Sequence, residues 1–296
     1  MGNCAGYCNG QGENEDGQIR QSFNKQDMIN NQHNDFENKY GKFPDTAPLT
    51  LFLSLGENPD GDYRKASRVL GKGTPDMRAT ADEQVDEYGR VTKGPYTLRN
   101  GATYTGQWLD GMRDGIGTQL WPDGSRYEGQ WRNDKANGQG KLVHADGDIY
   151  EGQWVNDKAE GMGTYSHANG AYYEGQWLDD KQHGHGVESW PDGARYEGKY
   201  EDGKKEGQGR LTFADGSYYE GQFEHNEISG FGHYYWPDGK SYAGYWRKNK
   251  MDGEGELKWK DGKMYKGNFV NDKREGQGTF IWADGRQYIG EWKAGK

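Results

Sequence analysis

The first eight residues contain groups that could be acylated. In the start MGNC, removal of Met1 would expose the amino group of Gly2 for N-myristoylation, and the thiols of Cys4 and Cys8 could accept palmitate. One myristoyl chain binds a membrane only marginally, and a second acyl chain makes the attachment stable. We therefore expect acylation at Gly2 and Cys4, with Cys8 as a further candidate. An unmodified N-terminus is the alternative, because Gly6 stands where the pattern has Ser or Thr.

Residues typical of catalytic and metal sites are present, but not in the arrangements that such sites need. His183 and His185 could share one face of a strand, yet no cysteine or third histidine lies near them in the sequence. The G-x-G pairs recur at a constant offset, which indicates a structural role, and the phosphate-binding pattern G-x-x-x-x-G-K-[ST] is missing. Many Asp residues are explained by turns. We expect no enzymatic activity, no metal and no cofactor.

The composition indicates a core built of rings and glycines. Only 31% of the 296 residues are hydrophobic, whereas 14% are aromatic and 49 are Gly. The longest apolar run, Leu49 to Leu55, is far shorter than the roughly 20 residues of a membrane-spanning helix, and no secretory signal opens the chain. Both cysteines lie in the first eight residues, so they could staple nothing distant. A cytoplasmic protein is expected.

A tyrosine followed two residues later by glycine recurs at a constant interval of 23 residues. The nine tyrosines are Tyr104, Tyr127, Tyr150, Tyr173, Tyr196, Tyr219, Tyr242, Tyr265 and Tyr288. Four residues after each stands another ring, in the order Trp108, Trp131, Trp154, Trp177, Tyr200, Phe223, Trp246, Phe269 and Trp292. An unbroken series of this kind predicts a repeat architecture.

Alternation within each repeat predicts two short strands. In Tyr150-x-Gly152-x-Trp154 the rings and the glycine are spaced by two and share one face, which leaves Glu151 and Gln153 outside. Gly between two rings leaves a trough for rings from flanking strands, so that even Ala should push the rings apart. Asp-Gly and Asn-Asp pairs between the strands favour turns. Each unit therefore reads as strand, loop, strand and tight turn, and stacked units predict an all-β, antiparallel sheet.

The pattern Y-x-G-x-W, then G-x-G, then D-G in 23 residues resembles the MORN repeat (membrane occupation and recognition nexus), over about residues 94 to 296. The resemblance implies an elongated, twisted single sheet of stacked β-hairpins. Members include junctophilins, radial-spoke head proteins of cilia and cortical scaffold proteins of single-celled parasites. Other members carry a lipid kinase or lysine methyltransferase domain, for which this chain has no stretch of sufficient size.

The first hundred residues differ from the repeats. Residues 1–47 are rich in Asn, Gln and Asp, which predicts a low-complexity tail unable to order itself. Residues 48–93 are expected to form an extended linker or docking segment, and residues 94–296 the MORN-repeat array. Leu49 to Leu55 could be a strand that packs within the chain or a hook for a partner.

Charge is spread unevenly along the chain. Residues 1–100, 101–241 and 242–296 carry net charges of −3, −11 and +4, a balance that argues against nucleic-acid binding. The basic end could contact an acidic partner or could merely solubilise the sheet. Its candidate contact residues are Arg247, Lys248, Lys250, Lys258, Lys260 and Lys263.

We interpret the chain as a non-enzymatic scaffold that assembles proteins, in a ciliary or axonemal complex such as a radial spoke or in a cortical membrane-cytoskeleton complex. Attachment to the cytoplasmic face of a membrane through acyl chains and self-association through sheet ends are further expectations. The alternative is a ligand- or lipid-binding module, in which aromatic repeats recognise choline, glycans or phosphoinositides. The acidic middle of the chain argues against anionic lipid.

Overall fold

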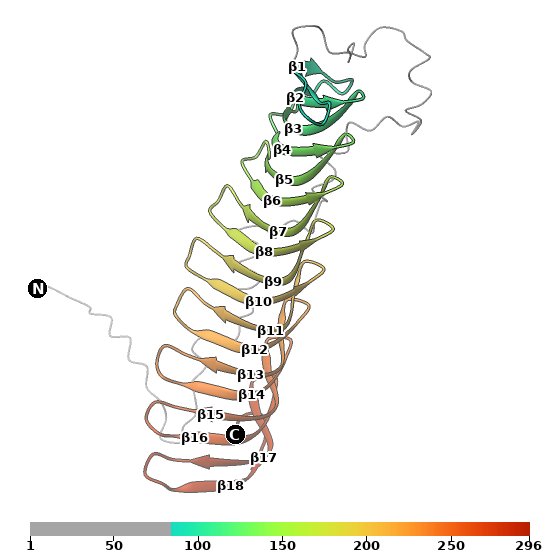
Figure 1. The fold of residues 1–296 in the computed structure, drawn as a ribbon. Coiled ribbons are helices and arrows are strands. Elements are labelled where there is room, and N and C mark those ends of the chain that lie inside the picture. The colour runs from blue at the N-terminus through green and yellow to red at the C-terminus, as the bar shows by residue number, and fades with distance from the viewer. Residues whose placement is uncertain (1–83) are drawn as a thin grey trace, which may run out of the picture. The chain divides into compact units, whose positions relative to one another are not determined.

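The structure, a computed structural model, describes residues 84–296, and every regular element within that range is a β-strand (Figure 1). The acylation candidates Gly2, Cys4 and Cys8, the tail 1–47 and the run from Leu49 to Leu55 lie outside the described residues. Residues 84–296 contain no helix long and apolar enough to cross a bilayer. The described part falls into two compact units, 84–227 and 228–296, which are treated one after the other.

The first unit is a meander of strands of seven or nine residues (Figure 1). The strands are β1 (Val91–Thr97), β2 (Thr103–Leu109), β3 (Met112–Leu120), β4 (Arg126–Arg132), β5 (Lys135–Val143), β6 (Ile149–Val155), β7 (Lys158–Ser166), β8 (Tyr172–Leu178), β9 (Lys181–Ser189), β10 (Arg195–Glu201), β11 (Lys204–Thr212) and β12 (Tyr218–Glu224). Each pairs antiparallel with the next. Pairing starts before residue 94, because Val85 forms an isolated bridge with Val91.

The second unit repeats the same design. Its strands are β13 (Glu227–Tyr235), β14 (Ser241–Arg247), β15 (Lys250–Lys258), β16 (Met264–Val270), β17 (Lys273–Ile281) and β18 (Gln287–Trp292). From β13 to β18, each strand again pairs antiparallel with its successor. The predicted all-β class, built of antiparallel hairpins, is therefore confirmed in both units.

The register brings the glycines of neighbouring strands face to face. Gly140 lies opposite Gly152, and Gly152 lies opposite Gly163. The phenol of Tyr150 covers Gly152 and Gly163, so a Cβ added to Gly163 would lie 2.4 Å from the Tyr150 hydroxyl oxygen. This geometry supports the prediction that even Ala would displace the rings.

The inward rings form one edge-to-face series. Tyr150 meets Trp154 of its own repeat at 4.9 Å and Trp177 of the next repeat at 5.2 Å, with the ring planes nearly perpendicular. The Trp154 indole N–H donates to the Gly140 carbonyl of the preceding repeat, at 3.0 Å. Tyr150 is fully buried, and this burial raises the pKa of its phenol far above the usual value. The rings thus join successive repeats.

Two turn types connect the strands. Asn156 and Asp157 both have positive φ, 50° and 71°, as a two-residue type I′ hairpin turn requires. The other connection spans five residues, with the Trp121 N–H bonded to the Ser125 carbonyl and a positive φ of 95° at Gly124. Asp favours this turn through a local hydrogen bond, as predicted, because the Asp123 carboxylate accepts from the Ser125 N–H at 2.8 Å.

Candidate functional site

The inward, aromatic face of the first unit is filled by its own side chains. The tyrosines from Tyr104 to Tyr219 that begin the repeats are fully buried, and Trp154 is 1% exposed. Rings in this state cannot form an open cage or stack on a sugar. The surface that the repeats offer to other molecules is therefore the opposite face, which we call the outward face.

A β-bulge breaks the register of the β2–β3, β4–β5, β6–β7 and β8–β9 hairpins, and it recruits the glutamine of the Y-x-G-Q-W motif. Pairing shifts between Gly152 and Trp154, and the Gln153 side-chain oxygen accepts a hydrogen bond of 2.8 Å from the Met162 N–H. Gln107, Gln130 and Gln176 make the same bond nine residues onward, at 2.7 to 2.8 Å. Gln153 is exposed on the outward face, as predicted, but its side-chain oxygen also holds the bulge, so only the amide nitrogen is left for another molecule.

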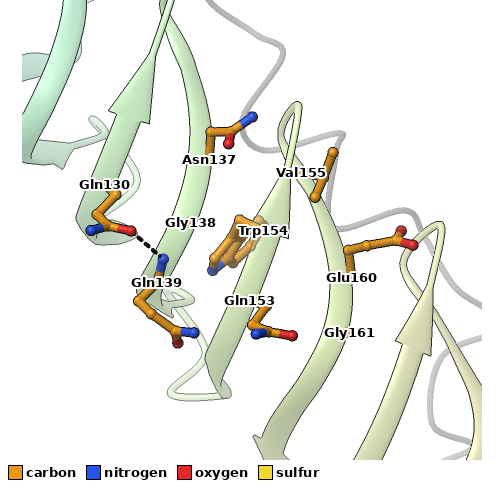
Figure 2. A pocket seen from close by; sticks show the side chains of 9 residues that line it. All are labelled: Gln130, Asn137, Gly138, Gln139, Gln153, Trp154, Val155, Glu160 and Gly161. Carbon is orange, nitrogen blue, oxygen red and sulfur yellow. Dashed lines mark hydrogen bonds between the residues drawn. The ribbon is translucent and has the colours of Figure 1, made fainter.

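Glycine at the bulge makes room for that amide. A Cβ on Gly161, whose φ is +69°, would lie 1.8 Å from the Gln153 oxygen. The bulge therefore leaves a depression at the outward surface, and between β4 and β7 it becomes a hollow of about 370 Å³ (Figure 2). Figure 2 shows its lining around Trp154: Gln130, Asn137, Gly138, Gln139, Gln153, Val155, Glu160 and Gly161.

The residue ten positions after each repeat tyrosine lies beside the bulge. In five repeats it is an acid, and the sequence alone did not single it out: Asp114, Glu160, Glu206, Asp252 and Glu275. Glu160 accepts from the Asp179 N–H at 3.2 Å, and Glu206 accepts from the His225 N–H at 3.0 Å, each at the first turn residue of the next repeat. The recurrence of an acid one residue before the G-x-G was the available signal.

A buried ionic group joins β9 and β11 among the inward rings. The Lys205 amine lies 2.6 Å from the Glu188 carboxylate, both side chains are under 10% exposed, and the Tyr200 hydroxyl donates to the same carboxylate at 2.9 Å. The amine also lies 5.0 Å from the centre of the Trp190 ring. Burial and the adjacent Glu188 charge raise the pKa of Tyr200 well above its usual value. The group is internally satisfied and holds adjacent repeats together.

The six basic residues predicted to contact an acidic partner are divided by the fold. Arg247, Lys248 and Lys250 surround the turn between β14 and β15, whereas Lys258, Lys260 and Lys263 surround the next turn, at the other end of β15. A nine-residue strand separates the two groups by roughly 25 to 30 Å. Several of these charges are paired locally: Arg247 with Asp252, Lys258 with Glu256 and Lys263 with Asp261.

The second unit has an aromatic cluster on its outward face that the sequence reasoning missed. Phe231 and Tyr245 are cross-strand partners with ring centres 5.6 Å apart, and they are 45% and 51% exposed. His233 lies 5.4 Å from Phe231, on the same strand. The available signal was a ring at Tyr245, where most repeats have Gln.

His183 and His185, for which the sequence offers no third ligand, flank the bulge glycine Gly184 on β9, where the Gln176 side chain accepts from the His185 N–H at 2.8 Å. Among residues 84–296, no group of three or more His, Cys, Asp or Glu side chains is arranged to hold a metal ion.

The model of the MORN repeat family matches nine consecutive segments. They are residues 104–126, 127–149, 150–172, 173–195, 196–218, 219–241, 242–264, 265–285 and 288–296. A comparison with curated proteins finds no match.

Three similar solved structures come from centriolar proteins. The TCP domain of SAS-4 (dCPAP) from Drosophila melanogaster, solved with a proline-rich motif of Ana2 (dSTIL), is 14% identical, with 64% of this chain and 97% of that one covered and a TM-score of 0.33. The G-box domain of the microcephaly protein CPAP is 13% identical, with 60% of this chain and 100% of that one covered and a TM-score of 0.33. The TCP10 domain of Danio rerio CPAP is 12% identical, with 71% of this chain and 94% of that one covered and a TM-score of 0.25. Similarities at these scores carry no argument about function.

Proposed function

Because the chain belongs to the MORN-repeat family, a family of repeat scaffolds and binding modules, we propose that it is a non-enzymatic scaffold whose outward face assembles proteins. The observation that carries this proposal is that the two faces of the repeats differ in which side chains they present to other molecules. The inward rings are consumed by packing between repeats, whereas the outward face presents polar side chains at a constant 23-residue interval. A surface of that kind can make many weak contacts at once.

Rigidity supports the same role. Asp157 bonds to the backbone of the preceding repeat, the Trp154 indole bonds to the Gly140 carbonyl, and the rings interlock along the series. Partner sites on such a support keep their spacing. A binding constellation placed on rigid elements is more precise than one placed on loops.

A ligand- or lipid-binding role has less support. Cages for choline or platforms for glycans need exposed rings, and the repeat rings of the first unit are buried. Residues 84–227 carry a net charge of −10, which repels anionic headgroups. The basic second unit is more suitable for an acidic protein surface. Its contact edge is the group Lys258, Lys260 and Lys263, because the five-residue turns of the neighbouring repeats also carry a basic residue, Lys240 and Arg286, at the position of Lys263.

We place the scaffold in the cytoplasm, at a ciliary, axonemal or cortical cytoskeletal structure, and attached to membrane by acyl chains on Gly2 and Cys4. The acylation pattern of the first residues supports the membrane attachment. The ciliary and cortical assignment follows the family resemblance.

Proximity labelling with the full chain tests this proposal. The wild type should label a reproducible set of cytoskeletal or ciliary proteins. Gly2→Ala should leave the membrane fraction but keep most of that set. The outward-face double variant Glu151→Lys/Glu220→Lys should lose much of it. A labelled set unchanged by the double variant, in protein that remains folded by circular dichroism, contradicts the role given to the outward face.

A further inference from the structure

In the first repeat, the chain itself fills the depression beside the bulge with an arginine. The Arg90 guanidinium bonds the Asp114 carboxylate at 2.7 Å, and its side chain lies against Gly115, where an added Cβ would meet the Arg90 Cδ at 2.9 Å. The Gln107 amide nitrogen donates to Asp86 at 3.3 Å. A short turn, from Asp86 to Arg90, thus uses both free groups of the bulge: the carboxylate and the amide nitrogen.

A second arginine occupies the corresponding carboxylate in the second unit. Arg247 pairs with Asp252, which stands ten residues after Tyr242. Two of the five acids at this offset therefore hold an arginine from the same chain.

The third repeat has the same two groups without an arginine. Val155 stands at the offset of Arg247, and Glu160 stands at the offset of Asp114. Within the described residues Glu160 has no ion pair, since the nearby Lys158 amine binds Asp179 at 2.7 Å, and the Gln153 amide nitrogen donates no hydrogen bond. Both groups line the hollow in Figure 2.

Only the first and third repeats combine glutamine at the third offset with an acid at the tenth. In the other repeats one of the two is replaced. The pairs there are Gln130 with Asn137, Gln176 with His183, Lys199 with Glu206, Gln222 with Ser229, Tyr245 with Asp252 and Asn268 with Glu275. The pair of groups that the Asp86 to Arg90 turn uses in the first repeat thus recurs once, and there both groups line an open hollow.

We propose that the hollow between β4 and β7 receives an arginine side chain from a partner protein, with Glu160 as its counter-charge and the Gln153 amide nitrogen as donor to an adjacent carbonyl or carboxylate of the same segment. The net charge of −10 on residues 84–227 attracts basic segments toward this face. Arginine fits better than lysine, because its planar fork can bond Glu160 and the nearby amide oxygens of Asn137 or Gln139 together. The inference rests on the scaffold role and specifies one of its contacts.

A blocked peptide with the sequence of residues 84–91, QVDEYGRV, serves as the probe, because this segment fills the equivalent site in the first repeat. Added to the ¹⁵N-labelled, deuterated full chain, it should shift the NMR signals of the Gln153 side-chain amide and the Met162 backbone amide in a saturable way. A peptide with citrulline in place of arginine keeps the shape but removes the charge, and it should produce no saturable shift.

Glu160→Gln is the matched protein variant, since glutamine can still accept from the Asp179 N–H. It should weaken peptide binding about tenfold, the effect of one charge-assisted bond. Glu174→Gln makes the same change of net charge outside the hollow and should leave affinity within about twofold.

The proposal fails if the citrulline peptide binds equally well, or if the two glutamine variants weaken binding alike, which would show general charge attraction only. The comparison of the two peptides on wild-type protein decides the matter even if Glu160→Gln does not fold. Loss of partners in the proximity labelling with no arginine-dependent shift would leave the scaffold role standing and remove this site.

Discussion

The Asp157 carboxylate accepts a hydrogen bond of 2.7 Å from the backbone N–H of Ala136, which lies 21 residues earlier, in the preceding repeat. The Asp157 N–H also donates to the Ala136 carbonyl, at 3.0 Å. The same pair of bonds joins Asp180 to Ala159, and Asn249 to Ile228 in the second unit. These three turns therefore clasp the hairpins before them.

Loss of the clasp should destabilise the array. Asp157→Ala leaves the buried Ala136 N–H without its acceptor, which costs about 1 to 3 kcal/mol. Thermal unfolding followed by circular dichroism should show a lower midpoint. Asp157→Asn keeps an oxygen in place, as Asn249 does naturally, and should cost much less. Equal losses in the two variants would show that the side-chain acceptor is not what matters.

The glycine under each tyrosine should not tolerate a side chain. Gly163→Ala would place a Cβ 2.4 Å from the Tyr150 hydroxyl oxygen, so overpacking should cost about 1 to 3 kcal/mol. Adding Tyr150→Phe should recover part of this loss, because the nearest atom is removed. Gly193→Asn is the control: that position has a positive φ of 91° and open space, and Asn adopts such backbone readily. Urea unfolding of the wild type, Gly163→Ala, Tyr150→Phe, their double variant and Gly193→Asn would measure these differences. No coupling between positions 150 and 163 would contradict the prediction.

The buried pair of Lys205 and Glu188 should behave as a unit. Lys205→Met leaves the Glu188 charge buried with only Tyr200 beside it, and this should cost about 3 to 5 kcal/mol. The double variant Lys205→Ala/Glu188→Leu reproduces the equivalent pair of Ala159 and Leu142, which are both fully buried, and it should recover most of the stability. Chemical unfolding checks both, and a double variant no better than the single one would refute the coupling.

Stability should fall on mild acidification because of His144. Burial lowers the pKa of this imidazole below its usual 6.5, despite the opposing effects of Asp146 and Asp148. The unfolded chain then takes up a proton at higher pH than the folded one, so the contribution is complete above pH 6.5 and is lost as pH falls toward the lower, folded pKa. Thermal midpoints measured from pH 7.5 to 5.5 should decline in the wild type and less in His144→Trp. Tryptophan is the natural residue at the equivalent position of two other repeats, Trp121 and Trp190. If the midpoints of the two proteins declined equally with pH, His144 would not be the cause of the loss of stability.

Much of the fold could be predicted because its determinants are local. Spacing by two in Tyr150-x-Gly152-x-Trp154 places the rings on one face, in agreement with the structure. Asn156 and Asp157 were expected to favour a turn, but the connection expected as a loop is a two-residue hairpin turn. The need for glycine beneath the rings could also be foreseen. The outward role given to Gln153 was incomplete, since its bond to Met162 depends on a bulge that strand alternation does not reveal.

By itself, the sequence determined the repeat, the all-β hairpin unit, the inward rings and the family resemblance, since these depend on residues a few positions apart. The tertiary structure alone decided the Asp157 clasp, the Lys205 and Glu188 pair and the hollow with Glu160, because the groups involved come from different strands. Residues 17 to 21 positions apart meet only when one hairpin stacks on the next. The fold also divides the basic residues near the end of the chain, because Arg247 and Lys263 lie at opposite ends of β15. Counting charges along the sequence does not reveal this separation.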